Sequence, residues 1–169
     1  MRRGRHYATF TLRELGQDDV LYILAGVVGS DFEPSRTGRM VMDSGWILDT
    51  RSGRFACGDG SDDGTEMNWE GQPENDELKK GGVVVRLLPS PLPRTPRHSR
   101  RCAVQGMLLD LDAATLTVYV NGERKGVMVR PGMTDPYGEP VPQLEGPLRW
   151  AVDLDGEVKI DGPLPPPTV

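Results

Sequence analysis

Residues 104–129 read VQGMLLDLDAATLTVYVNGERKGVMV and carry the clearest structural signal in the chain. Within them, residues 116–120 alternate between aliphatic and polar or aromatic side chains, a period of two that is typical of a strand with one buried face. Residues 113–115 predict a tight turn before this strand, and Asn121-Gly122 supplies residues that tolerate positive φ in the hairpin turn after it. The stretch therefore predicts three consecutive antiparallel strands. Such a scaffold suggests a function carried by its surface loops, without a buried reactive site.

Similar strand-like segments recur through the rest of the chain, separated by clusters of Gly, Pro, Asp and Asn. The 169 residues include 21 Gly and 15 Pro, which favours frequent turns over long helices. The pattern predicts an all-β fold, an antiparallel two-sheet β-sandwich, in one domain over residues 1–162 with a proline-rich tail at 163–169. The predicted strands are 6–12, 20–28, 45–49, 53–57, 83–88, 104–111, 116–120, 126–129, 148–154 and 157–160.

The composition of the chain narrows its possible partners and location. A net charge of −5 argues against general binding of nucleic acid or of an anionic membrane surface. No apolar run approaches the ~18 residues that suggest a membrane-spanning helix. The two cysteines, Cys57 and Cys102, form no motif, which favours a reduced intracellular setting, cytoplasmic or nuclear. We expect a monomer whose partner is a protein or peptide.

Two loops stand out by their charge. Residues 58–78 contain eight acidic residues and no Lys or Arg, whereas residues 89–103, PSPLPRTPRHSRRCA, contain four prolines, four arginines and no acidic residue. Because prolines block ladder pairing and charges prefer water, the second loop is predicted to be a basic insertion at the surface. Its arginines would also suit phosphate or RNA, and Ser90 and Thr95 precede prolines and would suit phosphorylation.

Short motifs follow one another along the chain in a characteristic order. They are Gly4-Arg5-His6-Tyr7, the AGVVG of 25–29, Gly45-Trp46 with Asp49 nearby, the stretches 106–112 and 116–122, Gly126-Val127, and the GPLRWAV of 146–152. Their order and spacing resemble the SPRY domain, a module of the concanavalin A-like sandwich class. The resemblance covers nearly the whole chain. It implies a non-catalytic adaptor or protein–protein interaction module that needs no cofactor.

Peptide-binding SPRY domains recognise their partners through loops at one end of the sandwich. By motif, the resemblance assigns this site to the loop before the Gly-Trp pair, here 34–43, and to the turn after the Ala-Val strand, here 154–156. The arginines of the first loop would pair with carboxylates or carbonyls of the partner, and its methionine would supply an apolar anchor. The predicted contacts on this rim are Arg36, Arg39, Met40, Leu154, Asp155 and Gly156.

Trp69 lies in the acidic loop between Asn68 and Glu70. An exposed ring there would be a further anchor for a protein partner, whereas packing of the loop onto the body would bury it. The same cluster supports the main alternative function, a carbohydrate-binding lectin, because a sugar site needs an aromatic platform beside polar groups. Trp46 and Trp150 are predicted to fill the core.

Paired carboxylates raise the possibility of a glycosidase. Asp110 and Asp112 lie two residues apart on a predicted strand, so their side chains share a face, and Asp153 and Asp155 repeat the spacing. However, no separate general acid lies near them in the sequence, and Asp112 abuts a turn where Asp commonly accepts backbone hydrogen bonds. The sequence therefore predicts no enzyme.

A calcium site is the one metal candidate. Asp59, Ser61 and Asp63, followed by Gly64 and Glu70, match the ligand spacing of a calcium loop. No helix is predicted on either side of this segment, so a solvated acidic loop competes with the calcium interpretation.

Overall fold

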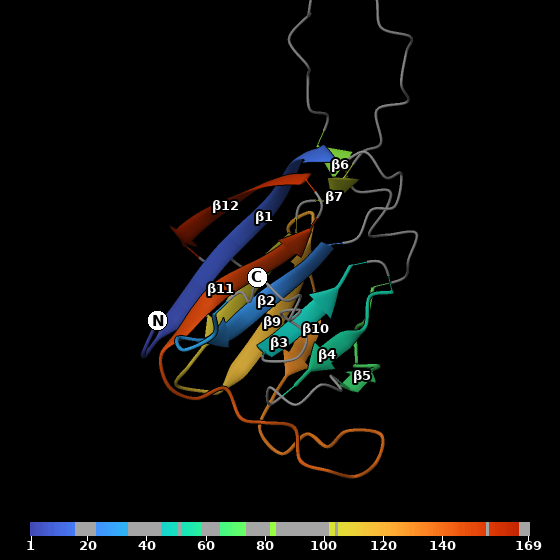
Figure 1. Cartoon of the computed structure of the whole chain (residues 1–169), viewed down its shortest axis with the longest axis vertical. Coiled ribbons are helices and arrows are strands. Elements are labelled where there is room, and N and C mark those ends of the chain that lie inside the picture. Colours follow the sequence, from blue (N-terminus) through green and yellow to red (C-terminus); the bar gives the residue numbers. More distant parts are fainter. Residues whose placement is uncertain are drawn as a thin grey trace, which may run out of the picture.

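The structure is a computed structural model that describes residues 1–15, 23–33, 45–50, 52–58, 65–73, 82–83, 102–103, 105–154 and 156–165. The described chain forms two five-stranded antiparallel sheets and one two-stranded sheet, and it contains no helix. The two large sheets lie against each other as two layers (Figure 1). The prediction of an all-β, two-sheet antiparallel sandwich is confirmed.

The first sheet contains the strand run that the sequence showed most clearly. Its strands are ordered β10-β9-β8-β1-β12, so the two hairpins of residues 105–129 continue onto β1 near the N-terminus. β12 completes the sheet as an edge strand beside β1. The bounds are β1 Arg5–Leu15, β8 Gln105–Asp110, β9 Thr115–Val120, β10 Glu123–Val129 and β12 Gly156–Leu164.

The second sheet is ordered β11-β2-β3-β4-β5, and β6 and β7 pair with each other in a separate two-stranded sheet, in which β7 contacts β1. Two of these strands, β3 and β11, have the bounds that the sequence predicted. The bounds are β2 Ile23–Gly29, β3 Gly45–Asp49, β4 Phe55–Cys57, β5 Thr65–Met67, β6 Gly82–Val83, β7 Cys102–Ala103 and β11 Leu148–Leu154.

The main core lies between the two large sheets. β9 contributes Leu116 and Val118, and β2, β3 and β4 contribute apolar side chains that face them and are equally buried. Each such aliphatic side chain contributes roughly 1.5–3 kcal/mol by leaving water. Trp46 and Trp150 are half-buried and pack against this core, so their predicted core role is correct only in part.

The opposite face of β9 is also buried, which differs from the one-sided strand that the alternation predicted. Thr117 is 6% exposed and Tyr119 is 3% exposed. Tyr119 forms a small cluster with Leu108 and Tyr7, and the rings of the two tyrosines meet edge to face at 5.5 Å. Burial, and to a lesser degree the neighbouring Tyr119, raise the pKa of Tyr7 above its ordinary value.

The strand registers define two ends of the sandwich. At the first, the Met1 end, Leu148 pairs with Gly29, and the Met1 amino group donates a hydrogen bond to the Leu148 carbonyl oxygen at 2.5 Å. At the second, the Gly156 end, Leu154 pairs with Ile23 and Gly156 begins β12. Figure 1 shows the N-terminus beside the start of β11. The strand ends of the two large sheets can therefore be assigned to one end or the other.

Candidate functional site

The two predicted contact segments are attached to the described part of the domain at different points. Arg36, Arg39 and Met40 lie outside the described residues, in a segment bounded by Glu33 and Gly45. Gly45 pairs with Val28 at the Met1 end, whereas Leu154 and Gly156 flank the junction at the other end. The seven residues of β11 separate these points by about 20 Å. The attachment points of the two segments thus lie at opposite ends, whereas the sequence motifs predict one rim.

Trp69 is a core residue, so its prediction as an exposed anchor is wrong. Its side chain is 7% exposed, packs in the main core, and donates a hydrogen bond from Nε1 to the Gly53 carbonyl oxygen at 2.9 Å. The neighbours Asn68 and Glu70 are exposed. The aromatic platform on which the lectin alternative depended is therefore absent at this position.

The Gly156 end of the second sheet is built from two turns that interlock. In the β3–β4 turn, the Ser52 hydroxyl donates to Asp49 Oδ2 at 2.7 Å, and the Gly53 N–H donates to the Asp49 carbonyl at 2.8 Å. From the turn after β5, the Gln72 amide donates to the Ser52 carbonyl at 3.2 Å. Gly53, with φ of 71°, lies so close to this second turn that an added Cβ would sit 2.4 Å from the Pro73 carbonyl oxygen.

The turn after β5 is also docked against the other layer. A Cβ added at Gly71 would lie 2.2 Å from the Lys125 carbonyl oxygen, and one at Gly126 would lie 2.4 Å from the Glu70 carbonyl oxygen. Both contacts join the second sheet to β10 of the first. The backbone here is fixed by close approach that only glycine permits, so this end presents preorganised turns.

The junction between β11 and β12 lies on the same end. Residue 155 alone separates Leu154, the last residue of β11 in the second sheet, from Gly156, the first of β12 in the first sheet. Leu154 pairs with Ile23, and the next residue of β2 pairs with Asp49, so about 10 Å separate the junction from the β3–β4 turn. Asp155 itself and the side chains of its two neighbours lie outside the described part.

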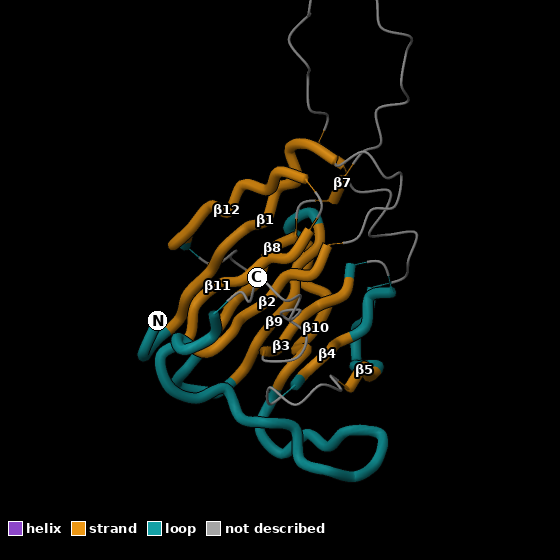
Figure 2. The backbone as a smooth tube through the Cα atoms, in the orientation of Figure 1, coloured by secondary structure: helices purple, strands orange, loops and turns teal. Residues whose placement is uncertain are grey.

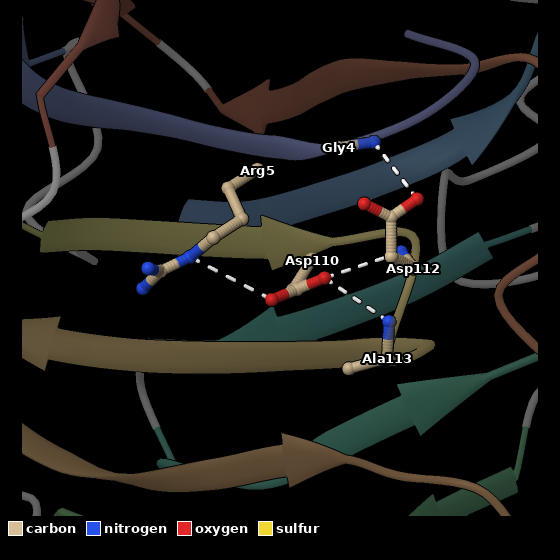
Figure 3. A network of polar contacts seen from close by, with 5 residues as sticks. All are labelled: Gly4, Arg5, Asp110, Asp112 and Ala113. Carbon is tan, nitrogen blue, oxygen red and sulfur yellow. Dashed lines mark hydrogen bonds and ion pairs between the residues drawn. The ribbon is translucent and has the colours of Figure 1, made fainter.

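Asp110 and Asp112 have structural roles at the Met1 end (Figure 3). Asp110 Oδ1 accepts hydrogen bonds from the backbone N–H groups of Asp112 at 3.1 Å and Ala113 at 3.0 Å, and its Oδ2 lies 3.6 Å from Arg5 Nε. Asp112 Oδ1 accepts from the Gly4 N–H at 3.3 Å. These carboxylates fasten the β8–β9 turn to the N-terminal segment, and nothing in this arrangement supports the glycosidase interpretation.

The calcium candidate is described only at its last ligand. Glu70 is exposed, whereas Asp59 and Asp63 lie outside the described residues. Across the described ranges, no group of three or more His, Cys, Asp or Glu side chains is placed to hold a metal ion. The calcium site stays a prediction.

The ends of the basic insertion are held together by β6 and β7. Gly82 pairs with Ala103 and Val83 with Cys102, so two residues that the sequence analysis assigned to the insertion belong to a strand. Residues 84–101, which hold the arginines and the serine and threonine of the predicted phosphorylation sites, lie outside the described part.

A comparison with known proteins gives a match for the structure but not for the sequence. No protein-family pattern and no curated protein matches the sequence. The structure, in contrast, is similar to the crystal structure of the SPRY domain of human HERC1, with a TM-score of 0.51 over 95% of this chain and 76% of that chain. This chain has a SPRY-like fold. The identity over that SPRY domain is 13%, so the likeness concerns the fold.

The SPRY-like fold confirms the resemblance that the sequence motifs indicated. The motifs Gly45-Trp46 and 106–122 occupy β3 and the β8–β9 hairpin, which form the centre of the two sheets. In the described part of this SPRY-like domain, no helix is long and apolar enough to cross a membrane.

Proposed function

We propose that this SPRY-like domain is a non-catalytic protein-interaction module that binds a peptide or protein partner at its Gly156 end. The observation that carries the proposal is the rigidity of this end. Two turns there are interlocked by hydrogen bonds and by glycine contacts, and one of them is docked against the other sheet. A surface fixed before binding avoids the entropy cost of ordering loops around a partner.

The chemistry of the junction suits a polar partner. In the sequence, Asp155 is the one residue that separates β11 from β12, and the half-buried Asp153 lies near the end of β11. A carboxylate in this position would accept hydrogen bonds from backbone N–H groups or from Lys or Arg of a bound peptide. Gly156 would let the partner backbone approach closely, and Leu154 would add apolar contact.

The other predicted contacts form a separate group. Arg36, Arg39 and Met40 belong to a segment attached at the Met1 end, about 20 Å from the junction along β11. A short peptide held at one end is therefore expected to depend on one of the two groups. Substitutions in the segment 34–43 can therefore serve as controls for substitutions at the β11–β12 junction, and the reverse.

The proposal can be tested without knowing the natural partner. Peptides are selected from a random phage-displayed library on the purified chain, and their affinity is measured by isothermal titration calorimetry. We expect Asp155→Ala to weaken a selected peptide at least about tenfold, as loss of a central polar contact does. The matched control Glu145→Ala removes an exposed acid at the Met1 end and should leave the affinity unchanged.

Two results would count against the proposal. Peptides that lose affinity only in the combined Arg36→Ala, Arg39→Ala and Met40→Ala variant would place the site at the Met1 end. A library that yields no peptide, or only peptides insensitive to both groups of substitutions, would rule out the proposed peptide site at the Gly156 end.

A further inference from the structure

A long connection at the Met1 end has an ordered shape of its own. Residues 130–147, here called the lobe, join β10 to β11 and extend beyond the strand ends (Figure 2). Inside the lobe, the Val141 N–H donates to the Met133 carbonyl at 2.9 Å, and Thr134 bridges to Pro140 in antiparallel fashion. The lobe is therefore a small hairpin.

The base of the lobe is anchored in the body of the domain. Val141 and Leu144 are buried in the main core, and Met133 packs against it. The Trp46 Nε1–H donates to the Pro142 carbonyl oxygen at 2.8 Å, and the Ser30 N–H donates to the Pro147 carbonyl oxygen at 2.9 Å. These contacts tie the lobe to β3 and to the turn after β2, so its tip is held in a defined place.

The tip is fixed by one carboxylate. Asp135 Oδ1 accepts hydrogen bonds from the backbone N–H groups of Tyr137 at 2.9 Å and Glu139 at 2.8 Å. The Asp135 N–H in turn donates to the Glu139 carbonyl at 2.8 Å. Gly138 adopts a φ of 89°, which closes the turn. The backbone that carries Tyr137 is thus ordered before any partner arrives.

Tyr137 is 84% exposed, whereas the two other exposed large apolar side chains in the described part, Ile160 and Leu164, are 42% and 39% exposed. Tyr137 lies in the turn of the hairpin, between the paired residues Thr134 and Pro140. Tyrosine has only two side-chain torsions to immobilise, so its burial by a partner costs little entropy. Central aromatic residues of this kind often dominate the affinity of an interface.

The charge around the ring indicates the chemistry of the partner. The lobe contains three acidic residues, Asp135, Glu139 and Glu145, and one basic residue, Arg130, at its first position and outside the hairpin turn. Asp135 and Glu139 lie two residues on either side of Tyr137. A partner surface with Lys or Arg around an apolar pocket would complement both the ring and this acidic surround.

We propose that the lobe is a second interaction surface, in which Tyr137 inserts into a phenol-sized apolar pocket of a protein partner with a basic rim. This inference goes beyond the interaction at the Gly156 end, because the lobe lies at the other end and can engage a different partner. Its failure would leave the proposed peptide site unaffected.

The test begins with the full chain in its own cells. Tyr137→p-azidophenylalanine places a photo-crosslinker of similar size at the tip. As the control, Lys159→p-azidophenylalanine places one at an exposed position within the edge strand β12, between the two ends. We expect a discrete crosslinked protein from position 137 only. It should be lost when excess wild-type chain competes, and retained when excess Tyr137→Ala chain competes.

The crosslinked protein is then identified, purified and titrated with variants of the chain. Tyr137→Ala should weaken binding about 30-fold or more, and Tyr137→Phe only a few-fold, because it keeps the ring. Asp135→Asn with Glu139→Gln keeps a side-chain acceptor for the tip while removing both charges. It should slow association and flatten its dependence on salt.

The proposal would be overturned by the absence of a crosslinked protein at position 137, or by equal capture of the same protein from position 159. It would also be overturned by an affinity that Tyr137→Ala leaves unchanged, or that Tyr137→Phe reduces as much as Tyr137→Ala does. An association rate of the wild-type chain that is independent of salt would exclude the basic rim.

Discussion

Gly71 and Gly122 adopt the same left-handed backbone in different surroundings. Their φ angles are 89° and 83°. At Gly71 an added Cβ would lie 2.2 Å from a backbone oxygen of β10, whereas at Gly122 it would meet no atom within 4 Å. Comparing the two therefore separates the cost of the backbone conformation from the cost of the close approach between the sheets.

We expect Gly122→Ala to lower the free energy of unfolding by roughly 1–2 kcal/mol, the cost of a left-handed non-glycine residue. Gly71→Ala should lose roughly 1–3 kcal/mol more, because the turn and β10 must move apart. Urea denaturation of both variants measures the difference. Equal losses would show that the turn after β5 is not locked against β10.

The burial of Trp69 follows an alternation that is visible in the sequence around it. Met67 and Trp69 are buried while Asn68 and Glu70 are exposed, so the period of two continues past the end of β5. The acidic composition of residues 58–78 predicted an exposed loop, in spite of this alternation. The spacing of Trp69 could therefore have assigned this lone aromatic residue to the core. Its hydrogen bond to Gly53 could not be predicted, because that bond joins positions 16 residues apart in the sequence.

At the scale of elements, the β8–β9 turn depends on the carboxylate of Asp110. Asp110→Ala removes the acceptor for two backbone N–H groups and should destabilise the fold by roughly 1 kcal/mol. Asp110→Asn keeps an oxygen acceptor and loses only the pair with the exposed Arg5, so its stability should lie within about 0.5 kcal/mol of wild type. Thermal or urea unfolding distinguishes the variants, and an Asn variant as unstable as the Ala variant would contradict the turn-capping role.

Strand bounds were predictable where turn residues flank an apolar-rich run on both sides. β3 and β11 have the predicted bounds because such runs are bounded there by Gly, Asp or Gly-Pro. β5, Thr65–Met67, was missed because it has one apolar residue inside an acidic run. This strand exists through its pairing with β4, and such a tertiary contact leaves little trace in three residues.

At the scale of the molecule, the motifs predicted the sandwich, whereas the points at which its loops attach depend on strand register. The segments 34–43 and 154–156 were assigned to one rim. The pairing of Gly45 with Val28 and of Leu154 with Ile23 attaches them to opposite ends. Such registers join strands far apart in sequence, so they are settled by the packing of the whole domain and cannot be read from any one segment.

Hydrogen–deuterium exchange of the chain with and without a selected peptide tests most directly whether recognition occurs at the Gly156 end. We predict slower exchange in the β3–β4 turn, in the turn after β5, and across the β11–β12 junction, with the lobe tip around Tyr137 unchanged. Protection confined to the lobe tip or to the β8–β9 turn, with none at the Gly156 end, would contradict the account.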